Sequence, residues 1–218
     1  MEKVPARAKL ELIATVLLAA VGGYGDAASY LLVHCFTGHV TGNTVLAAIG
    51  LTVRGGHAWQ PVLAVCCFLM ATAFAQRLRP PERQSLGRSR FRYVLLVEIA
   101  LLSLGPWLLS VHPALLIAAM CLSLGLQNGA LSEADGIGLH TTYLSGMMTH
   151  FVRSLVRPGS HSVGLQERKL IALVACGFLA GALCGSLMIL HAGTKGIWGM
   201  PVGLLAVIGL SFLSPSAI

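Results

Sequence analysis

Two polar stretches that interrupt long apolar runs decide the fold of this chain. The first pairs Gly25-Asp26 with Thr37-Gly38-His39-Val40-Thr41-Gly42-Asn43, and the second pairs Gln127-Asn128 with Thr141-Thr142-Tyr143-Leu144-Ser145-Gly146-Met147. The two align at offsets of 102 to 104 residues, each near the start of one half of the chain. A polar break that recurs inside lipid-compatible sequence is typical of solute or ion sites in membrane transporters. The stretches do not identify a solute.

The composition excludes a soluble protein. Hydrophobic residues make up 56% of the 218 residues and charged residues 11%, and the mean hydropathy is +0.78. Soluble domains carry about 25% charged residues. The net charge of +7 is concentrated in short segments beside apolar runs, where it signals membrane topology rather than nucleic-acid binding. We therefore predict one all-α polytopic membrane domain over residues 1–218.

Loop charges indicate which apolar stretches cross the bilayer. Six stretches approach the ~20 residues that a crossing needs, whereas two are too short. With a cytoplasmic N-terminus, the arginine-rich loop at 77–92 is cytoplasmic only if the first short stretch does not cross, and the basic loop at 157–169 is then cytoplasmic only if the second does not cross either. We predict six transmembrane helices plus two short re-entrant or broken helices, with both termini cytoplasmic. The eight stretches are roughly 10–33, 40–53, 59–76, 91–110, 113–132, 143–156, 169–190 and 200–214.

The two halves resemble each other beyond the polar breaks. Residues 66–72 align with residues 176–182 at a constant offset of 110, with Cys-x-Phe-Leu in common. Three crossings per half is an odd number, so the second copy would be inverted relative to the first. We predict two inverted repeats, at about 9–110 and 113–216, a common plan of transporters. Chance similarity between helices rich in Leu, Ala and Gly is the alternative.

Four motifs resemble a known family. They are Gly-Tyr-Gly-Asp-Ala-Ala-Ser-Tyr at 23–30, His-Val-Thr-Gly-Asn at 39–43, Gly-Leu-Gln-Asn-Gly at 125–129 and Thr-Thr-Tyr-Leu-Ser-Gly at 141–146. They are similar to the YoaK-like family of bacterial multi-pass inner-membrane proteins, grouped under a domain of unknown function. Ser145 stands where threonine is expected and keeps the hydroxyl. The resemblance implies a polytopic helical fold in the bacterial inner membrane and implies no activity.

Asp26 is the leading candidate for a functional side chain. An ionised carboxylate at membrane depth costs at least ~2.5–3.5 kcal/mol, so such residues face a cavity or a partner. Alternatively, Asp26 caps the helix that ends near Val33. Asn128 takes the place of Asp26 in the second copy, with Gln127 beside it. These amides could bind a substrate or form an interhelical hydrogen bond.

Polar residues also begin the two short stretches. Ser, Thr and Asn accept hydrogen bonds from free helix N–H groups, and two helix N-termini inside the membrane would favour an anionic or carbonyl-bearing ligand. Ordinary helix caps at the membrane surface are the alternative. The candidate solute- or ion-binding residues are Tyr24, Asp26, Thr41, Gly42, Asn43, Gln127, Asn128, Thr142, Ser145 and Gly146.

Three further residues are candidates for coupling or for a vestibule. Glu98 is a lone acid in an apolar stretch and could carry a coupling proton or pair with Arg153 or His150. His150 and Arg153 share one helix face, where they could line a vestibule, or Arg153 could extend to lipid headgroups. Small residues at Gly177, Gly181 and Gly185 predict a helix-packing face that joins either the two halves or two protomers.

We expect a secondary transporter of a small polar or anionic solute, and proton coupling through Asp26 or Glu98 is a further hypothesis within that expectation. A channel with two re-entrant helices, or a non-transporting receptor or assembly protein, is the alternative. We expect no enzymatic activity, because catalytic motifs in a plausible setting are missing from the sequence. We expect no cofactor and no metal site, since the six cysteines lack zinc-ligand spacing. The expected partners are the lipid bilayer, a solute or ion, and a second copy through the glycine face.

Overall fold

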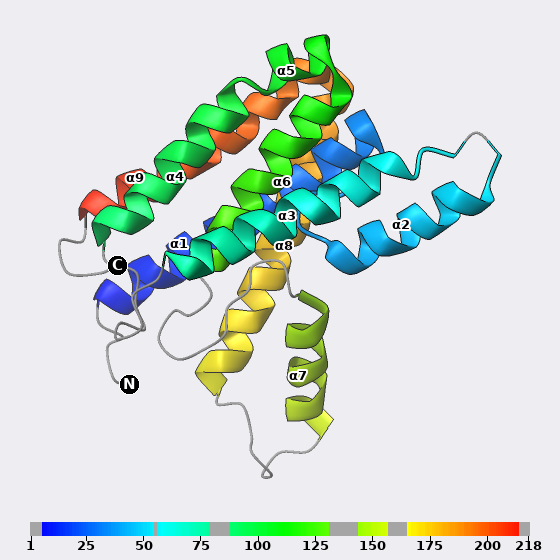
Figure 1. Cartoon of the computed structure of the whole chain (residues 1–218). Coiled ribbons are helices and arrows are strands. Elements are labelled where there is room, and N and C mark those ends of the chain that lie inside the picture. Colours follow the sequence, from blue (N-terminus) through cyan, green and yellow to red (C-terminus); the bar gives the residue numbers. More distant parts are fainter. Residues whose placement is uncertain (1–5, 55, 79–87, 131–143, 157–164, 214–218) are drawn as a thin grey trace.

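A computed structural model describes residues 6–54, 56–78, 88–130, 144–156 and 165–213, and all regular structure in these segments is helical. Figure 1 shows long helices crossing one another in a bundle, with α2 and α7 set to its sides. The elements are α1 Ala6–Val33, α2 Val40–Thr52, α3 Trp59–Arg77, α4 Arg88–Ser103, α5 Gly105–Val111, α6 Pro113–Ala130, α7 Leu144–Val156, α8 Leu165–Ala192, the 3₁₀ helix η1 Gly193–Trp198 and α9 Gly199–Leu213.

Each predicted apolar stretch contains a helix, which confirms the all-helical membrane fold. Four helical segments are long and apolar enough to cross a membrane: Leu12–Val33, Trp59–Arg77, Pro113–Ala130 and Arg168–Phe212. Helices α4 and α5 make a fifth if they count as one span with a 46° bend. Pro106 lies in the first turn of α5, where its missing N–H and its ring favour this break. The predicted count of six crossings is higher than this count of four or five.

Helices α1 and α8, from opposite halves of the chain, pack along a stripe of glycines. Gly177 lies against Val16, and a Cβ on Gly181 would overlap the backbone carbonyl of Ala20. The residue numbers on both helices rise together along the contact, so the helices run parallel. The glycine face is therefore occupied by α1 of the same chain, and the expectation that it could pair with a second copy is wrong for this face.

Helices α3 and α6 form a second parallel pair of the same kind. Gly125 lies against the backbone of Phe68, and Gly129 lies one turn further along against Thr72. The Thr72 hydroxyl donates a 3.1 Å hydrogen bond to the Gly125 carbonyl. Small residues let backbones approach closely, which favours dispersion contacts between helices in lipid.

Helix α9 runs antiparallel to both α1 and α4. Arg92 donates to the backbone carbonyl of Ser211 at 2.8 Å, and Trp198 donates to that of Ser103 at 3.0 Å, so α4 and α9 run in opposite directions. Along α1, Gly25 lies against Met200 and Val21 lies against Gly203. Figure 1 shows α4 and α9 side by side along one flank of the bundle.

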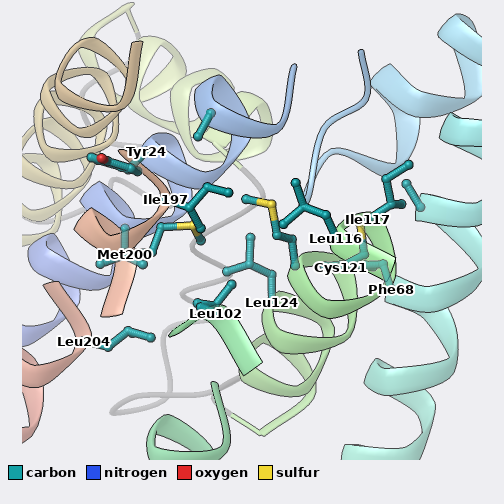
Figure 2. Packing of buried hydrophobic residues seen from close by; sticks show 14 of the residues in the cluster. Tyr24, Phe68, Leu102, Leu116, Ile117, Cys121, Leu124, Ile197, Met200 and Leu204 are labelled. Atoms are coloured by element: carbon teal, nitrogen blue, oxygen red, sulfur yellow. The ribbon is translucent and has the colours of Figure 1, made fainter. Parts of the chain in front are cut away.

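The main apolar core lies between α1, α4, α6 and α9. Gly105, at the start of α5, lies against Leu116 and Ile197, so α6 begins at the end of the bundle where α4 ends. Helices α1 and α4 therefore run in one direction, and α6 and α9 in the other. Figure 2 shows core side chains from these helices converging, including Leu102, Leu124 and Leu204.

Candidate functional site

The chain reverses sharply after α1, and this turn builds the site around Asp26. The helix ends at Val33, and His34 follows with a φ of 53°, the left-handed conformation that often ends helices. The His34 N–H donates to the Tyr30 carbonyl at 3.0 Å. The segment that follows runs back along α1, which brings Thr37 to the level of Asp26, about two turns before the helix end.

The Asp26 carboxylate is saturated by this returning segment. Its Oδ1 accepts hydrogen bonds from the Thr37 N–H at 2.8 Å, the Thr37 hydroxyl at 2.9 Å and the Gly38 N–H at 2.9 Å. Asp26 is 5% exposed and Thr37 1% exposed. Hydrogen bonds to an ionised acceptor are stronger than neutral ones, so the carboxylate fixes the backbone of the turn. Asp26 therefore neither lies open to a cavity nor caps its own helix.

His39 pairs with the second carboxylate oxygen of Asp26. Its Nδ1 lies 2.6 Å from Asp26 Oδ2, and its side chain is 34% exposed. The hydrogen bond to Asp26 raises the pKa of His39, burial opposes that shift, and the negative charge of Asp26 adds to it. His39 is also the residue immediately before α2, and its ring packs edge-on against Phe178 of α8 at 5.7 Å. The pair therefore connects α1, α2 and α8.

Asn43 holds the same turn from the other side. Its Oδ1 accepts from the Phe36 N–H at 2.8 Å, and its Nδ2 donates to the Phe36 carbonyl at 2.7 Å. Thr41 is exposed, and Gly42 lies against the Phe36 ring. The Asn43 amide thus takes the place of backbone partners for the half-buried Phe36 N–H and carbonyl groups. Of the predicted 41–43 segment, Asn43 belongs to the turn, and Thr41 does not.

Thr37, Gly38 and His39 are the partners of Asp26 but were not among the candidate residues that the sequence indicated. The signal was present, because these residues belong to the repeated polar stretch that includes Asp26. Their contact requires the reversal at His34 and a separation of 11 to 13 residues, which spacing alone does not indicate.

The second half of the predicted site is described only in part. Gln127 is buried and Asn128 half-buried on α6, and Gly146 is half-buried near the start of α7. Thr142 and the side chain of Ser145 lie outside the described residues. Tyr24 is buried, and its hydroxyl donates to the Gly196 carbonyl of η1. Tyr24 therefore joins α1 to the turn between α8 and α9.

The interior also contains polar side chains with unmet hydrogen-bonding capacity. Within the described segments, the side-chain N and O atoms of Glu98, Ser123 and Gln127 have no hydrogen-bond partner, and each residue is at most 1% exposed. The expected pairing of Glu98 with Arg153 or His150 is therefore wrong. Both of those residues are exposed on α7, where Arg153 lines an open groove of about 650 Å³ with Met148, Thr149, Val152 and Val156. His150 does not line this groove.

These features define a multi-pass helical membrane protein in which the Asp26 carboxylate holds the turn after α1 and polar side chains are buried in the interior. Residues 14–210 match the family described as "Protein of unknown function (DUF1275)", and the chain belongs to this family. It is also similar to the UPF0700 transmembrane protein RA0705 of Rhizobium meliloti (strain 1021). The two are 23% identical over 211 residues, which cover 96% of this chain and 89% of the relative. No solved structure is significantly similar to the chain.

Proposed function

We propose that this chain is a secondary transporter of a small polar or anionic solute, built from two inverted repeats in the bacterial inner membrane. One observation carries the proposal. Gly23 lies against the backbone of Phe178, and Gly125 lies against that of Phe68. Gly125 is the counterpart of Gly23 in the second repeat, at an offset of 102 residues, and Phe178 is the counterpart of Phe68, at an offset of 110. The two contacts are therefore equivalent: in each, the glycine of one repeat meets the phenylalanine of the other. Helices α1 and α6 run in opposite directions, as inverted repeats require.

The proposal includes six crossings. Gly196 of η1 lies against Met188 of α8, so the chain turns back on itself within the 45-residue apolar segment. Counting α8 and α9 separately, with α4 and α5 as one bent span, gives six. Helices α2 and α7 have 13 residues each and begin and end 104 residues apart. At 1.5 Å per residue they reach about 20 Å, less than the ~30 Å of a hydrocarbon core, which supports re-entrant placement.

In this proposal both termini are cytoplasmic, and the solute binds between the halves, with the Asp26 turn at one end of its path. Asp26 acts as a positioning residue, since its oxygens are engaged by Thr37, Gly38 and His39. Rocking of one repeat against the other, through the close α1–α8 and α3–α6 contacts, would expose the site to each side in turn. The chain requires no cofactor and performs no covalent chemistry.

The saturation of Asp26 also favours the rival function. A carboxylate that accepts four hydrogen bonds from its own chain is well suited to hold a fixed turn, as in a receptor or assembly protein. The two functions differ in whether a bound solute crosses the bilayer.

Topology is tested with single cysteines in a background without the six native ones. His34→Cys and His57→Cys flank α2, and both positions are exposed. We expect an impermeant maleimide to label both from the same face of the membrane. Labelling from opposite faces would show that α2 crosses the membrane, which would contradict the proposed inverted repeats.

Transport is tested with the purified protein. A thermal-shift screen against small polar and anionic metabolites finds solutes that bind, since binding to the folded state raises apparent stability. Each hit is then offered to proteoliposomes and to protein-free liposomes, with and without a proton gradient. Uptake above the protein-free control supports a transporter. A solute that binds with micromolar affinity but never enters the vesicles supports the receptor.

A further inference from the structure

We propose that Glu98, Ser123 and Gln127 form a proton-binding site in the membrane interior, with Glu98 as the group that takes up and releases the proton. The proposal deepens the transporter function by naming the coupling ion, and it rests on that function only for the coupling. The site itself can be tested without a solute.

The burial of unpartnered polar groups is the first observation. Glu98 and Gln127 are 1% exposed and Ser123 is 0% exposed, and their side-chain N and O atoms form no hydrogen bond with any described residue. A buried charge without a partner is strongly disfavoured, and intramembrane acids commonly mark ion or proton paths. A proton neutralises the Glu98 carboxylate without any further ligand.

Helix register brings Glu98 and Ser123 to one level of the bundle and places Gln127 one helical turn away. Gly105 lies against Leu116, and α4 runs antiparallel to α6. Seven residues back from Gly105 is Glu98, and seven residues forward from Leu116 is Ser123. At 1.5 Å per residue both lie about 10 Å from the same end of the bundle, and Gln127 lies one turn beyond Ser123 on the same face of α6.

Side-chain direction narrows the gap between Glu98 and Gln127. Side chains lean toward the N-terminus of their own helix. Because α4 and α6 are antiparallel, Glu98 leans toward the level of Gln127, and Gln127 leans toward that of Glu98. After the side chains rearrange, the protonated carboxyl can donate to the Gln127 carbonyl oxygen, and the ionised carboxylate can accept from the Gln127 amide or the Ser123 hydroxyl.

The surroundings favour a proton over a metal cation. Three side chains offer four oxygens, fewer than a hard cation usually takes, and the buried core residues of α4 and α9, Leu95, Leu102 and Leu204, are apolar. Helices α5 and α9 carry no titratable side chain. On α6 the titratable group is Cys121, whose thiol lies 3.8 Å from the Phe36 carbonyl, and on η1 it is the exposed Lys195.

The nearest cation on α4 itself is Arg92, almost two turns from Glu98. Its guanidinium donates to Ser211 and lies 3.8 Å from the centre of the Phe212 ring, so it is already engaged at the end of the helix. Proton uptake by Glu98 is therefore expected to depend on its own surroundings, Ser123 and Gln127 included, rather than on Arg92.

The test uses a hydrophobic carbodiimide, which reacts with protonated carboxyls in apolar sites. The full chain in nanodiscs is treated at pH 6 to 9 in sodium or choline chloride, and peptide mass spectrometry locates the adduct. We expect an adduct on Glu98 whose rate falls as pH rises and is the same in both salts. The saturated Asp26 provides the internal control and should not react.

Two variants test whether Gln127 affects the protonation of Glu98. Gln127→Leu removes a donor to the ionised form and should move the pH midpoint of labelling up by about one unit. Gln60→Leu, which alters another buried amide on α3, should leave the midpoint unchanged. Absence of a Glu98 adduct, a rate independent of pH, protection by sodium, or equal shifts in both variants would each overturn the proposal. If the Glu98 adduct depends on pH but cysteine labelling shows that α2 crosses the membrane, the proton-binding site is supported and the proposed transporter architecture is contradicted.

Discussion

Replacement of Asp26 tests whether its carboxylate holds the turn between α1 and α2. Asp26→Ala leaves the buried N–H groups of Thr37 and Gly38 and the Thr37 hydroxyl without their acceptor, and it removes the partner of His39. An unsatisfied buried group costs about 1–3 kcal/mol. Because the turn can relax toward water near the partly exposed His39, we expect a total loss of about 3–5 kcal/mol, as when a buried ion pair is broken.

Asp26→Asn is the matched control. Its amide oxygen can still accept from Thr37 and Gly38, so it loses mainly the charge that strengthens these bonds and the pairing with His39. Neutral hydrogen bonds are weaker than charged ones by about 1–2 kcal/mol, and we expect a loss of that size. The free energy of unfolding would be measured by steric trapping in micelles, which allows reversible unfolding of a membrane protein.

Two results would contradict this account of Asp26. One is a loss below about 1 kcal/mol for Asp26→Ala, which would mean that the carboxylate contributes little to the turn. The other is greater stability for the variant than for the wild type. That outcome is expected of a strained binding residue, in which case Asp26 would serve a ligand and the positioning role would be wrong.

Three further changes test the packing and the turn. Gly181→Ala should lower the unfolding free energy by about 1–3 kcal/mol through overpacking, whereas Gly209→Ala, whose Cβ meets nothing within 4 Å, should leave it almost unchanged; equal effects in the same micelle assay would contradict the close helix contact. Asn43→Ala should reduce the melting temperature of the detergent-solubilised protein clearly more than Thr41→Ala, because Asn43 pairs with the half-buried backbone of Phe36 and Thr41 is exposed; the reverse order would refute this. The pKa of His39 is raised in the folded state, so its charge stabilises the fold fully below a pH of about 6.5 and loses that effect as pH rises through the folded pKa. The gap in melting temperature between wild type and His39→Gln should therefore shrink from pH 6 to pH 9, and a constant or widening gap would contradict it.

The sequence determined the class of protein and the positions of its helices. In a bilayer every backbone polar group must be satisfied within the chain, so long apolar runs become helices whatever their neighbours are. The runs at 40–53 and 143–156 appear as α2 and α7 with almost unchanged bounds. The polar stretch that includes Asp26 was also recognised, because polar residues are conspicuous in apolar sequence.

Only the tertiary structure decided what these polar residues contact. The Asp26 carboxylate meets Thr37 and His39 because the chain reverses at His34, whereas Glu98 is buried without a hydrogen-bond partner among the described residues. The stripe of glycines gains a partner, α1, that is 161 residues away in the sequence. Hydropathy is a property of each residue and can be read directly from the sequence. Hydrogen bonds and close helix contacts depend on the relative orientation of segments that are distant in the sequence, which only the fold determines.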